Sequence, residues 1–348
     1  MKESLNNSSP LVSVIIPNYN GVALLKGCLS SLIGASYPNV EFIMVDDASN
    51  DESERLVRER FPSVRVIRNP QNIGFSKASN LGIRAASGKY VILLNNDVEV
   101  EQGWLEPLVA EMESKPHLAA CQPKILSLKD RNRFEYAGAA GGLMDYLGYP
   151  FLRGRIFETM EMDHGQYDDP RDIFWTSGAA MCIRKEDLDH TGLLDEDFVF
   201  HMEEVDLCWR MHLMGYSLSY VPQSRVYHIA GATIKPHTFM KIYYNHRNSQ
   251  MMLMKNLGGR VLLPIMAKRF LLEFLTMAYA IRKGNLIWFE AVLCSLIWLF
   301  FHPGLIVSKR REVQRMRKVS DDEILKMIYP KSIVFDYYLR GKKKYSDL

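Results

Sequence analysis

The first hundred residues alternate between short apolar runs and amphipathic stretches. Apolar runs rich in β-branched residues and bounded by polar turns predict buried strands at 11–17, 40–45, 64–68 and 90–94. Apolar residues spaced three and four apart predict helices between them at 21–33, 50–60 and 76–86. This alternation implies right-handed crossovers and a mostly parallel sheet with helices on both faces. Ligands of such sheets bind at the carboxyl ends of the strands.

The rest of the chain has a different character. From residue 101 to about 258 the pattern is irregular, with a glycine-rich loop at 137–142. Strongly apolar helices are then predicted at 260–280 and 286–301, followed by a basic run at 309–318. We therefore divide the chain into three parts: a polar extension at 1–10, a main domain at 11–258 and a helical, basic segment at 259–348.

Composition narrows the class of protein. The 348 residues are 47% hydrophobic and 24% charged, with a net charge of +3, which is typical of an ordinary folded protein. This balance argues against a nucleic-acid binder that works by bulk charge. Five widely spaced cysteines without a C-x-x-C pair argue against a disulfide framework and a zinc site. The polar N-terminus has no apolar core of a signal peptide, so we expect the chain in the cytoplasm.

Acidic and amide side chains follow three of the predicted strands. They form the segments Pro-Asn-Tyr-Asn at 17–20, Asp-Asp-Ala-Ser-Asn-Asp at 46–51 and Asn-Asn-Asp at 95–97. Each segment alone is consistent with ordinary turn and helix-cap chemistry. Together at one edge of a parallel sheet, they suit hydrogen bonding to a nucleobase and ribose. They also suit an oxygen-ligated divalent cation that holds phosphates.

Four motifs, in order over roughly residues 11–250, resemble the family 2 glycosyltransferases, which have the nucleotide-sugar-binding GT-A fold. They are VSVIIPNYNG, VDDASNDES, NIGFSKASNLGIRAASGKYVILLNND and HMEEVDLCWRMHLMGY. The segments EYAGAAGGLMDYLGYP and FWTSGAAMCIRKEDL resemble rhamnosyltransferase-type members that build cell-surface polysaccharides. The resemblance implies an α/β fold of the GT-A class, with a Rossmann-like, mostly parallel sheet, followed by a C-terminal helical segment.

The resemblance also implies Mg²⁺ or Mn²⁺ on the diphosphate of the sugar donor. Asn95-Asn96-Asp97 stands where the family has Asp-x-Asp, so Asp97 is the expected carboxylate ligand. With one carboxylate we expect the cation to bind mainly together with the donor. His228 is expected to be a second metal ligand or a diphosphate contact, although a single histidine has many structural uses.

A cluster of carboxylates at the start of a predicted helix supplies the expected base. Glu203, Glu204 and Asp206 exceed what favourable interaction with the helix dipole needs. By resemblance to the family's E-D-x-D motif, Glu204 is the general base that accepts the proton of an acceptor hydroxyl. Attack opposite the leaving diphosphate then inverts the anomeric carbon. Glu203, Asp206 and Arg210 are expected on the acceptor side, with backbone or Arg210 contacts as the alternative for Asp206.

The resemblance implies donor contacts from strand ends and the loops after them: Pro17, Asn18, Asn20, Asp46, Asp47, Lys77, Asn95 and Asn96. Asp47 is expected to contact the pyrimidine edge, with Asp46 as a second candidate, and Lys77 to lie near the sugar or phosphates. Trp175 belongs to a segment expected to line the acceptor side. Its ring is either a platform for a sugar face or part of the core.

The C-terminal segment is predicted to contact a membrane without crossing it. The apolar run at 286–301 is shorter than the roughly 20 residues that a spanning helix needs. Trp288, Trp298 and the basic run favour a peripheral position on the inner face of the membrane, where lipid-linked acceptors lie. A packed helical cap and a homodimer surface are the alternatives.

These observations predict an inverting, metal-dependent glycosyltransferase. It adds one sugar, with rhamnose as the first expectation, from a nucleoside diphosphate donor to a glycan or lipid-linked acceptor. Asn95 and Glu204 in place of the commoner aspartates keep open a catalytically inactive sugar-nucleotide-binding or scaffold protein of the same fold. A nucleotidyltransferase is disfavoured because no glycine-rich phosphate loop opens the chain. A processive synthase is disfavoured because the chain has no Q-x-x-R-W motif.

Overall fold

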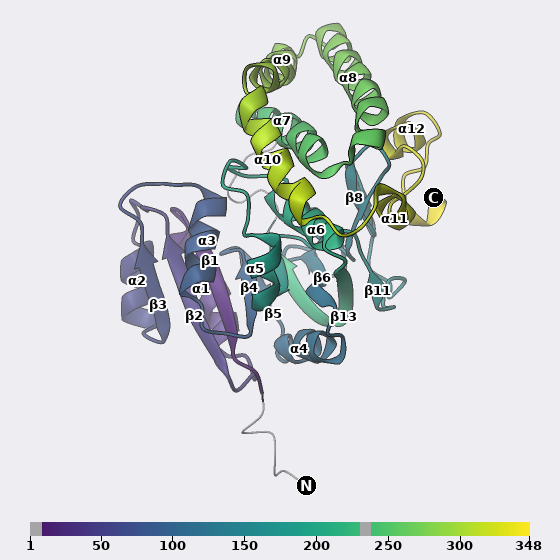
Figure 1. Ribbon diagram of the computed structural model, residues 1–348. Helices are drawn as coiled ribbons and strands as arrows, with labels where there is room; N and C mark the ends of the chain where they lie inside the picture. The colour runs from purple at the N-terminus through teal and green to yellow at the C-terminus, as the bar shows by residue number, and fades with distance from the viewer. Residues whose placement is uncertain (1–8, 230–237) are drawn as a thin grey trace.

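The computed structural model describes residues 9–229 and 238–348 (Figure 1). Within these residues the main sheet has nine strands, eight of them in the order β11-β13-β6-β12-β4-β1-β2-β3, with β5 paired to β13. Their bounds are β1 Val12–Asn18, β2 Val40–Asp46, β3 Val64–Arg68, β4 Tyr90–Leu94, β5 Val98–Val100, β6 Leu118–Ser127, β11 Arg171–Asp172, β12 Ala180–Arg184 and β13 Ser217–His228.

The sheet is parallel where the sequence predicted it to be. β1 runs parallel to both β2 and β4, and β2 runs parallel to β3. Beyond β4 the direction changes, because β12 lies antiparallel between β4 and β6. β13 returns parallel to β6. The mixed but mostly parallel α/β sheet is therefore confirmed, and the antiparallel β12 comes from the region that the hydrophobic pattern left irregular.

Helices cover both faces of this sheet because side chains alternate along its strands. Val14 and Ile16 of β1 pack in one core cluster with Leu25 of α1, whereas Ile15 packs in another cluster with Ile83 of α3. The helices of the first two thirds of the chain are α1 Val22–Ile33, α2 Ser53–Arg60, α3 Phe75–Ala85, α4 Leu105–Ser114, α5 Leu188–Thr191 and α6 Glu203–Leu213. The predicted helices therefore cover both faces, within a few residues of the expected bounds.

A small second sheet forms within the region that the hydrophobic pattern left irregular. Its strands are β7 Gly142–Met144, β8 Pro150–Leu152, β9 Arg155–Ile156 and β10 Thr159–Met160. Phe151 and Ile156 of this sheet pack with Ile333 and Tyr337 near the C-terminus. The last residues of the chain are therefore held against a sheet formed almost two hundred residues earlier.

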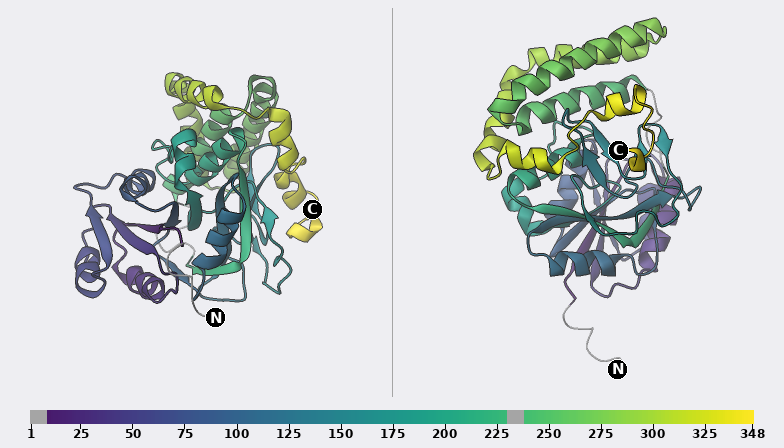
Figure 2. Two further views of the ribbon diagram at one scale, coloured as in Figure 1. Left: turned by 60° about the horizontal axis from the view of Figure 1, so that its bottom comes forward. Right: turned by 90° about the vertical axis from the view of Figure 1, so that its right-hand side faces the viewer.

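The C-terminal helices form a layer over one side of the main domain (Figures 1 and 2). They are α7 Phe239–Asn256, α8 Gly259–Arg282, α9 Leu286–Phe301, α10 Pro303–Met316, α11 Asp321–Met327 and α12 Ile333–Tyr338. The domain boundary proposed near Gly258 falls between α7 and α8. However, Leu299, Ile306 and Val313 belong to the same core cluster as Trp209 of α6, so the packing does not stop at that boundary.

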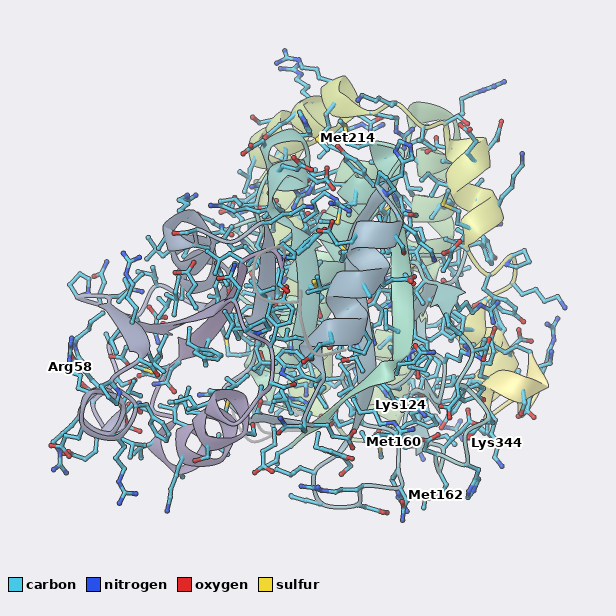
Figure 3. The ribbon with its side chains drawn as sticks, turned by 90° about the horizontal axis from the view of Figure 1, so that it is seen from below. Arg58, Lys124, Met160, Met162, Met214 and Lys344 are labelled. Atoms are coloured by element: carbon cyan, nitrogen blue, oxygen red, sulfur yellow. The ribbon has the colours of Figure 1, made fainter. Side chains whose placement is uncertain are left out.

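Buried charge joins an irregular loop to the main sheet. Lys124 of β6 is fully buried, and its Nζ lies 2.8 Å from Asp163 Oδ2 and also contacts Asp168. Figure 3, viewed from below, shows Lys124 close to the loop that carries Met160 and Met162 and far from Arg58. Because a buried ammonium is costly without a partner, this pairing fixes the loop against β6.

Close packing of α3 on β1 gives a test of the fold. A Cβ at Gly82 would overlap the Ile15 side chain and lie 3.2 Å from a methyl group of Val45. We expect Gly82→Ala to destabilise the protein by about 1–3 kcal/mol, because the core must shift to accept the methyl group. Thermal unfolding of the variant should show a lower midpoint.

Gly304→Ala is the matched control. Gly304 lies in α10, and an added Cβ there meets nothing within 4 Å. Alanine also favours a helix over glycine, so this variant should unfold at or slightly above the temperature of the parent protein. Equal midpoints for the two variants would contradict the close approach of α3 to β1.

Candidate active site

The carboxyl ends of β1, β2 and β4 meet at one edge of the sheet, as the pattern of the sequence predicted. Asn18 and Asp46 are directly paired in the register of β1 and β2. Just beyond β4, the Asn95 N–H donates to the Ala179 carbonyl at 3.1 Å, which brings the segment before β12 to the same edge. The polar segments that follow the strands are therefore neighbours in space.

Amide side chains form the floor of this edge. Asn96 Nδ2 donates to Asn18 Oδ1 at 2.7 Å, and Asn18 Nδ2 donates to Asp46 Oδ1 and Ser49 Oγ, each at 3.2 Å. A Cβ at Gly21 would overlap both amides. Glycine at that position therefore lets the first strand-to-helix turn lie directly against the amide pair.

The two aspartates at the end of β2, Asp46 and Asp47, have hydrogen-bond partners within the protein. Asp46 is fully buried and also receives a hydrogen bond from Arg68 at 2.8 Å. This burial leaves Asp46 no surface for a nucleobase and corrects the expectation of a second base contact. The Asp47 carboxylate accepts from the N–H groups of Ile73 and Gly74 at 2.9 Å and from Asn69 at 2.8 Å. It shapes the loop before α3, and a donor contact for Asp47 stays a prediction.

Other predicted donor residues lie around this floor. Asn20 is exposed with φ of 51°, and its Oδ1 accepts from the Asn50 N–H at 2.8 Å. Pro17 and Asn95 are half-buried, and Asn96 is 8% exposed. These side chains line the edge where strand ends meet, which is compatible with a ligand lying across it.

Asp97, His228 and Glu135 form a buried row of charged groups. His228 ends β13, and its Nε2 lies 3.0 Å from Asp97 Oδ1. Its other ring nitrogen, Nδ1, lies 2.9 Å from Glu135 Oε2. All three side chains are nearly inaccessible to solvent. The structure thus brings together the two predicted metal ligands and adds a carboxylate that orients the histidine ring.

The electrostatics of this row are compatible with a divalent cation. Burial by itself lowers the pKa of His228, but the adjacent carboxylates of Asp97 and Glu135 outweigh burial and raise it to about 10. The two carboxyl groups therefore favour a positive charge between them, and a cation bound by Asp97 and His228 would take the place of the proton on the ring. Asp97 Oδ1 has no well-aligned hydrogen-bond donor. A histidine held by a carboxylate on its second nitrogen is the usual arrangement of a metal-binding histidine.

The protein supplies only part of a complete coordination shell here. Among the residues that the structure describes, no group of three or more His, Cys, Asp or Glu side chains is arranged to hold a metal ion. Asp97 and His228 would therefore leave several positions for other oxygen ligands, such as those of a diphosphate.

Glu203 and Glu204 begin α6 as neighbouring carboxyl groups, of which Glu203 is buried and Glu204 is half-buried. Each has an Oε2 without a hydrogen-bond partner. Burial raises the pKa of both, and the neighbouring Glu204 charge raises that of Glu203 further. The backbone N–H of Gly178 lowers the pKa of Glu204 only in part. A carboxylate whose pKa is raised binds a proton more tightly, so it is a stronger base than an exposed carboxylate.

Two contacts through residues 178 and 179 place Glu204 near the segment that carries Asp97. An ideal Cβ at Gly178 would lie 3.9 Å from the Glu204 side chain, and the next residue, Ala179, accepts the hydrogen bond from Asn95. Asn95 is two residues from Asp97. The carboxylate at the start of α6 and the carboxylate after β4 therefore lie around the same end of β4 and β12.

The turn before α6 has an unusual backbone. His201 and Met202 are consecutive non-glycine residues with φ of 68° and 71°. Asn248 of α7 donates to the carbonyls of Phe200 and His201 at 3.0 and 2.8 Å. Such conformations are costly and are found where the surroundings impose them, often at functional sites. Here α7 imposes the turn that places Glu203 and Glu204.

Asp206 and Arg210 lie inside the protein. Asp206 is fully buried, and its Oδ2 lies 2.9 Å from both Arg210 Nε and Lys255 Nζ. Its Oδ1 accepts from Asn256 Nδ2 at 2.8 Å, and Arg210 also donates to the Thr191 carbonyl. This burial gives Asp206 no surface for an acceptor, so the structure favours the alternative of an Arg210 partner and corrects the acceptor contact.

Trp175 is also a core residue in this structure. It is 6% exposed, its Nε1 donates to the Leu143 carbonyl at 2.8 Å, and its ring lies directly over Gly142. The packing favours the structural alternative over a sugar platform.

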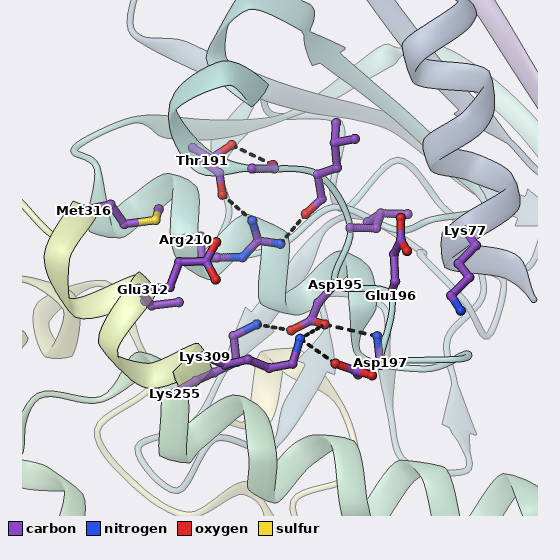
Figure 4. Close-up of a pocket in the computed structure, with 14 residues that line it drawn as sticks. Lys77, Thr191, Asp195, Glu196, Asp197, Arg210, Lys255, Lys309, Glu312 and Met316 are labelled. Carbon is purple, nitrogen blue, oxygen red and sulfur yellow. Dashed lines mark hydrogen bonds and ion pairs between the residues drawn. The ribbon is translucent and has the colours of Figure 1, made fainter. Parts of the chain in front are cut away.

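Lys77 lines a pocket of about 440 Å³ that includes neither Asp97 nor Glu204 (Figure 4). In the lining of that pocket, Asp195 pairs with both Lys255 and Lys309, and Asp197 pairs with Lys309. The two lysines hold the pKa of Asp195 far below its ordinary value, against the effect of burial. A contact of Lys77 with donor phosphates stays a prediction.

Two contributions to the site escaped the sequence. Glu135 is the first residue of the EYAGAAGG segment, so the signal was present, but nothing in the sequence indicated that it faces His228. Lys255 and Asn256 lie at the end of an ordinary-looking helix, and their contact with Asp206 appears only in three dimensions.

Comparison with known proteins shows the family and the fold. The model of "Glycosyl transferase family 2" matches residues 13–192. The N-acetylglucosaminyl-diphospho-decaprenol L-rhamnosyltransferase of Mycobacterium tuberculosis is 27% identical over 236 residues, which cover 63% of this chain and 76% of that protein. N-acetylgalactosaminyltransferase 6 of Drosophila melanogaster is 29% identical over 229 residues, covering 63% of this chain and 34% of the relative. The O-antigen biosynthesis protein RfbC of Myxococcus xanthus is 26% identical, and the match covers 65% of this chain but only 18% of RfbC.

Solved structures share the fold at low identity. GalNAc-T7, crystallised with UDP, GalNAc and Mn²⁺, superposes with a TM-score of 0.57 at 21% identity, covering 72% of this chain and 48% of that one. The mannosyltransferase PcManGT from Pyrobaculum calidifontis, in complex with GDP-Man and Mn²⁺, gives 0.51 at 17% identity, covering 90% of this chain and 82% of that one. These likenesses show the GT-A fold.

The burial of Asp206 distinguishes a structural role from an acceptor contact. Asp206→Ala would leave Lys255 and Arg210 buried without their carboxylate, so we expect a loss of stability of about 3–5 kcal/mol. Exposed Asp189, on the neighbouring α5, is the control, and Asp189→Ala should change stability by less than about 0.5 kcal/mol. The measurement is thermal or urea unfolding. Normal stability of Asp206→Ala with impaired acceptor use would restore the acceptor role.

Proposed function

Because the chain belongs to glycosyl transferase family 2, we propose that it is an inverting glycosyltransferase that moves one sugar from a nucleoside diphosphate to a glycan or lipid-linked acceptor. The observation that carries the proposal is the placement of Glu204 and the Asp97–His228 pair around the same end of β4 and β12. A base and a diphosphate-binding group on one edge are what a single displacement needs.

Rhamnose is the sugar that we propose first, in the synthesis of a cell-surface polysaccharide. The name of the Mycobacterium tuberculosis relative specifies a rhamnosyl transfer and a decaprenol-linked acceptor for that protein. The match spans most of that relative, which supports carrying the substrate class over. At 27% identity it supports the class of acceptor and donor better than their details.

Asp97 and His228 would hold Mg²⁺ or Mn²⁺ on the donor diphosphate, with Glu135 fixing the histidine ring. A bound dication stabilises the negative charge that develops on the departing nucleoside diphosphate. Pro17, Asn20, Asp47 and Asn95 lie where the nucleotide would cross the strand ends.

Glu204 would accept the proton of the acceptor hydroxyl while its oxygen attacks the anomeric carbon. Glu203 lies beside Glu204. Because the Glu204 charge raises the pKa of Glu203, the pair carries a single negative charge over a range of pH before both groups are ionised. The Glu204 side chain is one methylene longer than the commoner aspartate, and Gly178 leaves room beside it. The acceptor is therefore expected to approach past residues 177–179.

An inactive sugar-nucleotide-binding protein of the same fold is the second candidate, favoured by Asn95 in place of a carboxylate. Release of nucleoside diphosphate from a panel of nucleotide sugars with Mg²⁺ or Mn²⁺, with and without acceptor, separates the two. We expect release from a thymidine diphosphate rhamnose donor. Donor binding without any release across the panel would favour the inactive protein.

Asp97→Ala should abolish transfer and the donor-dependent binding of the cation, since it removes the carboxylate of the proposed metal site. Donor and Mn²⁺ titrations by calorimetry measure binding separately from turnover. Glu99→Ala, two residues along on β5, is the control and should retain both. Full activity of Asp97→Ala would contradict the assignment.

Glu204→Gln should keep donor binding and reduce turnover by about 10²–10⁴-fold, the usual contribution of a general base. Because burial raises the pKa of Glu204 above 4.5 and the base acts only when ionised, kcat/KM should rise with pH above that value. The Glu204 charge raises the pKa of Glu203, whereas Glu203 is still uncharged where Glu204 titrates, so Glu203→Gln should leave this rise near its original pH. A large shift of the pH profile in Glu203→Gln would show instead that Glu203 is the carboxyl group that ionises first.

A further inference from the structure

The two helices that lie farthest from the main sheet in Figures 1 and 2 are α8 and α9. They carry large apolar side chains that are exposed. We call them the outer face of α8 and α9. It consists of Leu263, Leu271, Phe274, Leu275, Tyr279, Ile281, Leu286, Ile287, Ile297, Phe300 and Phe301. Leu263 and Phe300 are 76% and 78% exposed. A continuous apolar surface of this kind on a folded protein marks an interaction site.

The buried side of α8 carries two charged side chains among its apolar ones. Its buried side carries Arg269 and Glu273, each 1% exposed, whereas its exposed side carries leucine, phenylalanine and tyrosine. Arg269 donates to Ser249 Oγ at 2.7 Å, and Glu273 accepts from Gln250 at 2.7 Å. A helix that faces water normally turns its charges outward and its apolar residues inward. Arg269 and Glu273 have partners inside the protein, whereas many of the large apolar side chains of α8 are exposed.

A groove between α8 and α9 opens on the same side. It encloses about 270 Å³ and is lined only by Met254, Phe270, Phe274, Leu296, Leu299 and Phe300. Two of these, Phe274 and Phe300, belong to the outer face. An apolar groove that is continuous with an exposed apolar surface suits a flexible hydrocarbon chain.

Basic residues frame this surface. Between residues 259 and 301 the exposed charged side chains are Arg260, Lys268, Arg282 and Lys283, against one exposed acid, Glu290. Beyond α9, the exposed charged residues of α10 are Arg311 and Arg315 together with one acid, Glu312. Two copies packed through this face would bring like charges together, whereas an anionic lipid surface complements them.

We propose that the outer face of α8 and α9 lies in the boundary between headgroups and acyl chains of an anionic membrane, with the groove holding a lipid chain. Helices of 24 and 16 residues extend over about 36 and 24 Å, which suits helices lying along an interface. Among the described residues no single helix is long and apolar enough to cross a bilayer, and α9 and α10 qualify only as a pair bent by 74°. The inference rests on the proposed function in one respect, since a lipid-linked acceptor would be met at this surface.

The protein carries its own reporter for this face. Cys294 on α9 is exposed, whereas the other four cysteines, all described by the structure, are buried. A polarity-sensitive fluorophore on Cys294 should shift to the blue with vesicles of phosphatidylcholine and phosphatidylglycerol, and less with phosphatidylcholine alone. The control carries Cys294→Ser and Ser36→Cys, which moves the label to an exposed site at the end of α1. No shift at Cys294, or an equal shift at position 36, would overturn the proposal.

Charge introduced into the face tests the same surface without a label. Leu271→Glu with Leu275→Glu should weaken vesicle binding by about tenfold or more, since two carboxylates would have to enter the interface. Ile33→Glu, at an exposed apolar position of α1, should bind as the parent does. Unchanged vesicle binding by the double variant would overturn the proposal. So would a parent dimer that this variant converts to monomers while vesicle binding is absent, which would assign the face to a second copy.

Vesicle binding is measured without donor or acceptor, and release of nucleoside diphosphate is measured without vesicles. Loss of binding with normal release in the double variant is the expected pattern. Failure of the proposed transfer chemistry would instead appear as absent release in a parent protein that binds vesicles.

Discussion

The buried carboxylate of Asp206 is the constraint on which the rest of the site depends. It lies one turn into α6, where Arg210, Lys255 and Asn256 surround it on both oxygens. Lys255 in turn pairs with Asp195, which also receives Lys309 from α10. A buried ion pair is weak evidence for stability, but removing one partner is costly. The helix that begins with Glu204 is therefore fixed by residues from α7 and α10 as well as by its own sheet.

The polar edge of the sheet and the strained turn before α6 are formed by different parts of the chain. The sheet alone brings Asn18, Asp46 and Asn96 together, because parallel strands end at a common edge. Glu203 and Glu204 reach that edge only through the left-handed turn at 201–202, which Asn248 holds from α7. The C-terminal helices thus position the proposed base and also carry the surface proposed to meet lipid.

The sequence was sufficient for what depends on local pattern. The four strands and three helices of the first hundred residues and the two apolar helices at the C-terminus follow from periodicity. The grouping of Asp97 with His228 follows from the resemblance to the family 2 glycosyltransferases. Asp46, Asp206 and Trp175 were harder, because type and spacing do not reveal whether a polar or aromatic group is exposed. Asp206 in particular belongs to the same short motif as Glu204, yet the contacts that bury it come from Lys255 and Asn256, about fifty residues later.

The pairing of Lys309 with Asp195 and Asp197 has a consequence for modular engineering. Arg310 and Gln314 of α10 also cap the carbonyl groups at the end of α7, so α10 is joined to the sugar-transferring unit at several points. A chimera that keeps only residues 11–258 would leave Asp195 paired with Lys255 alone. The carbonyl groups at the end of α7 would lose their partners from α10. A chimera would therefore have to keep α10, because α10 belongs to the same folded unit as the main domain.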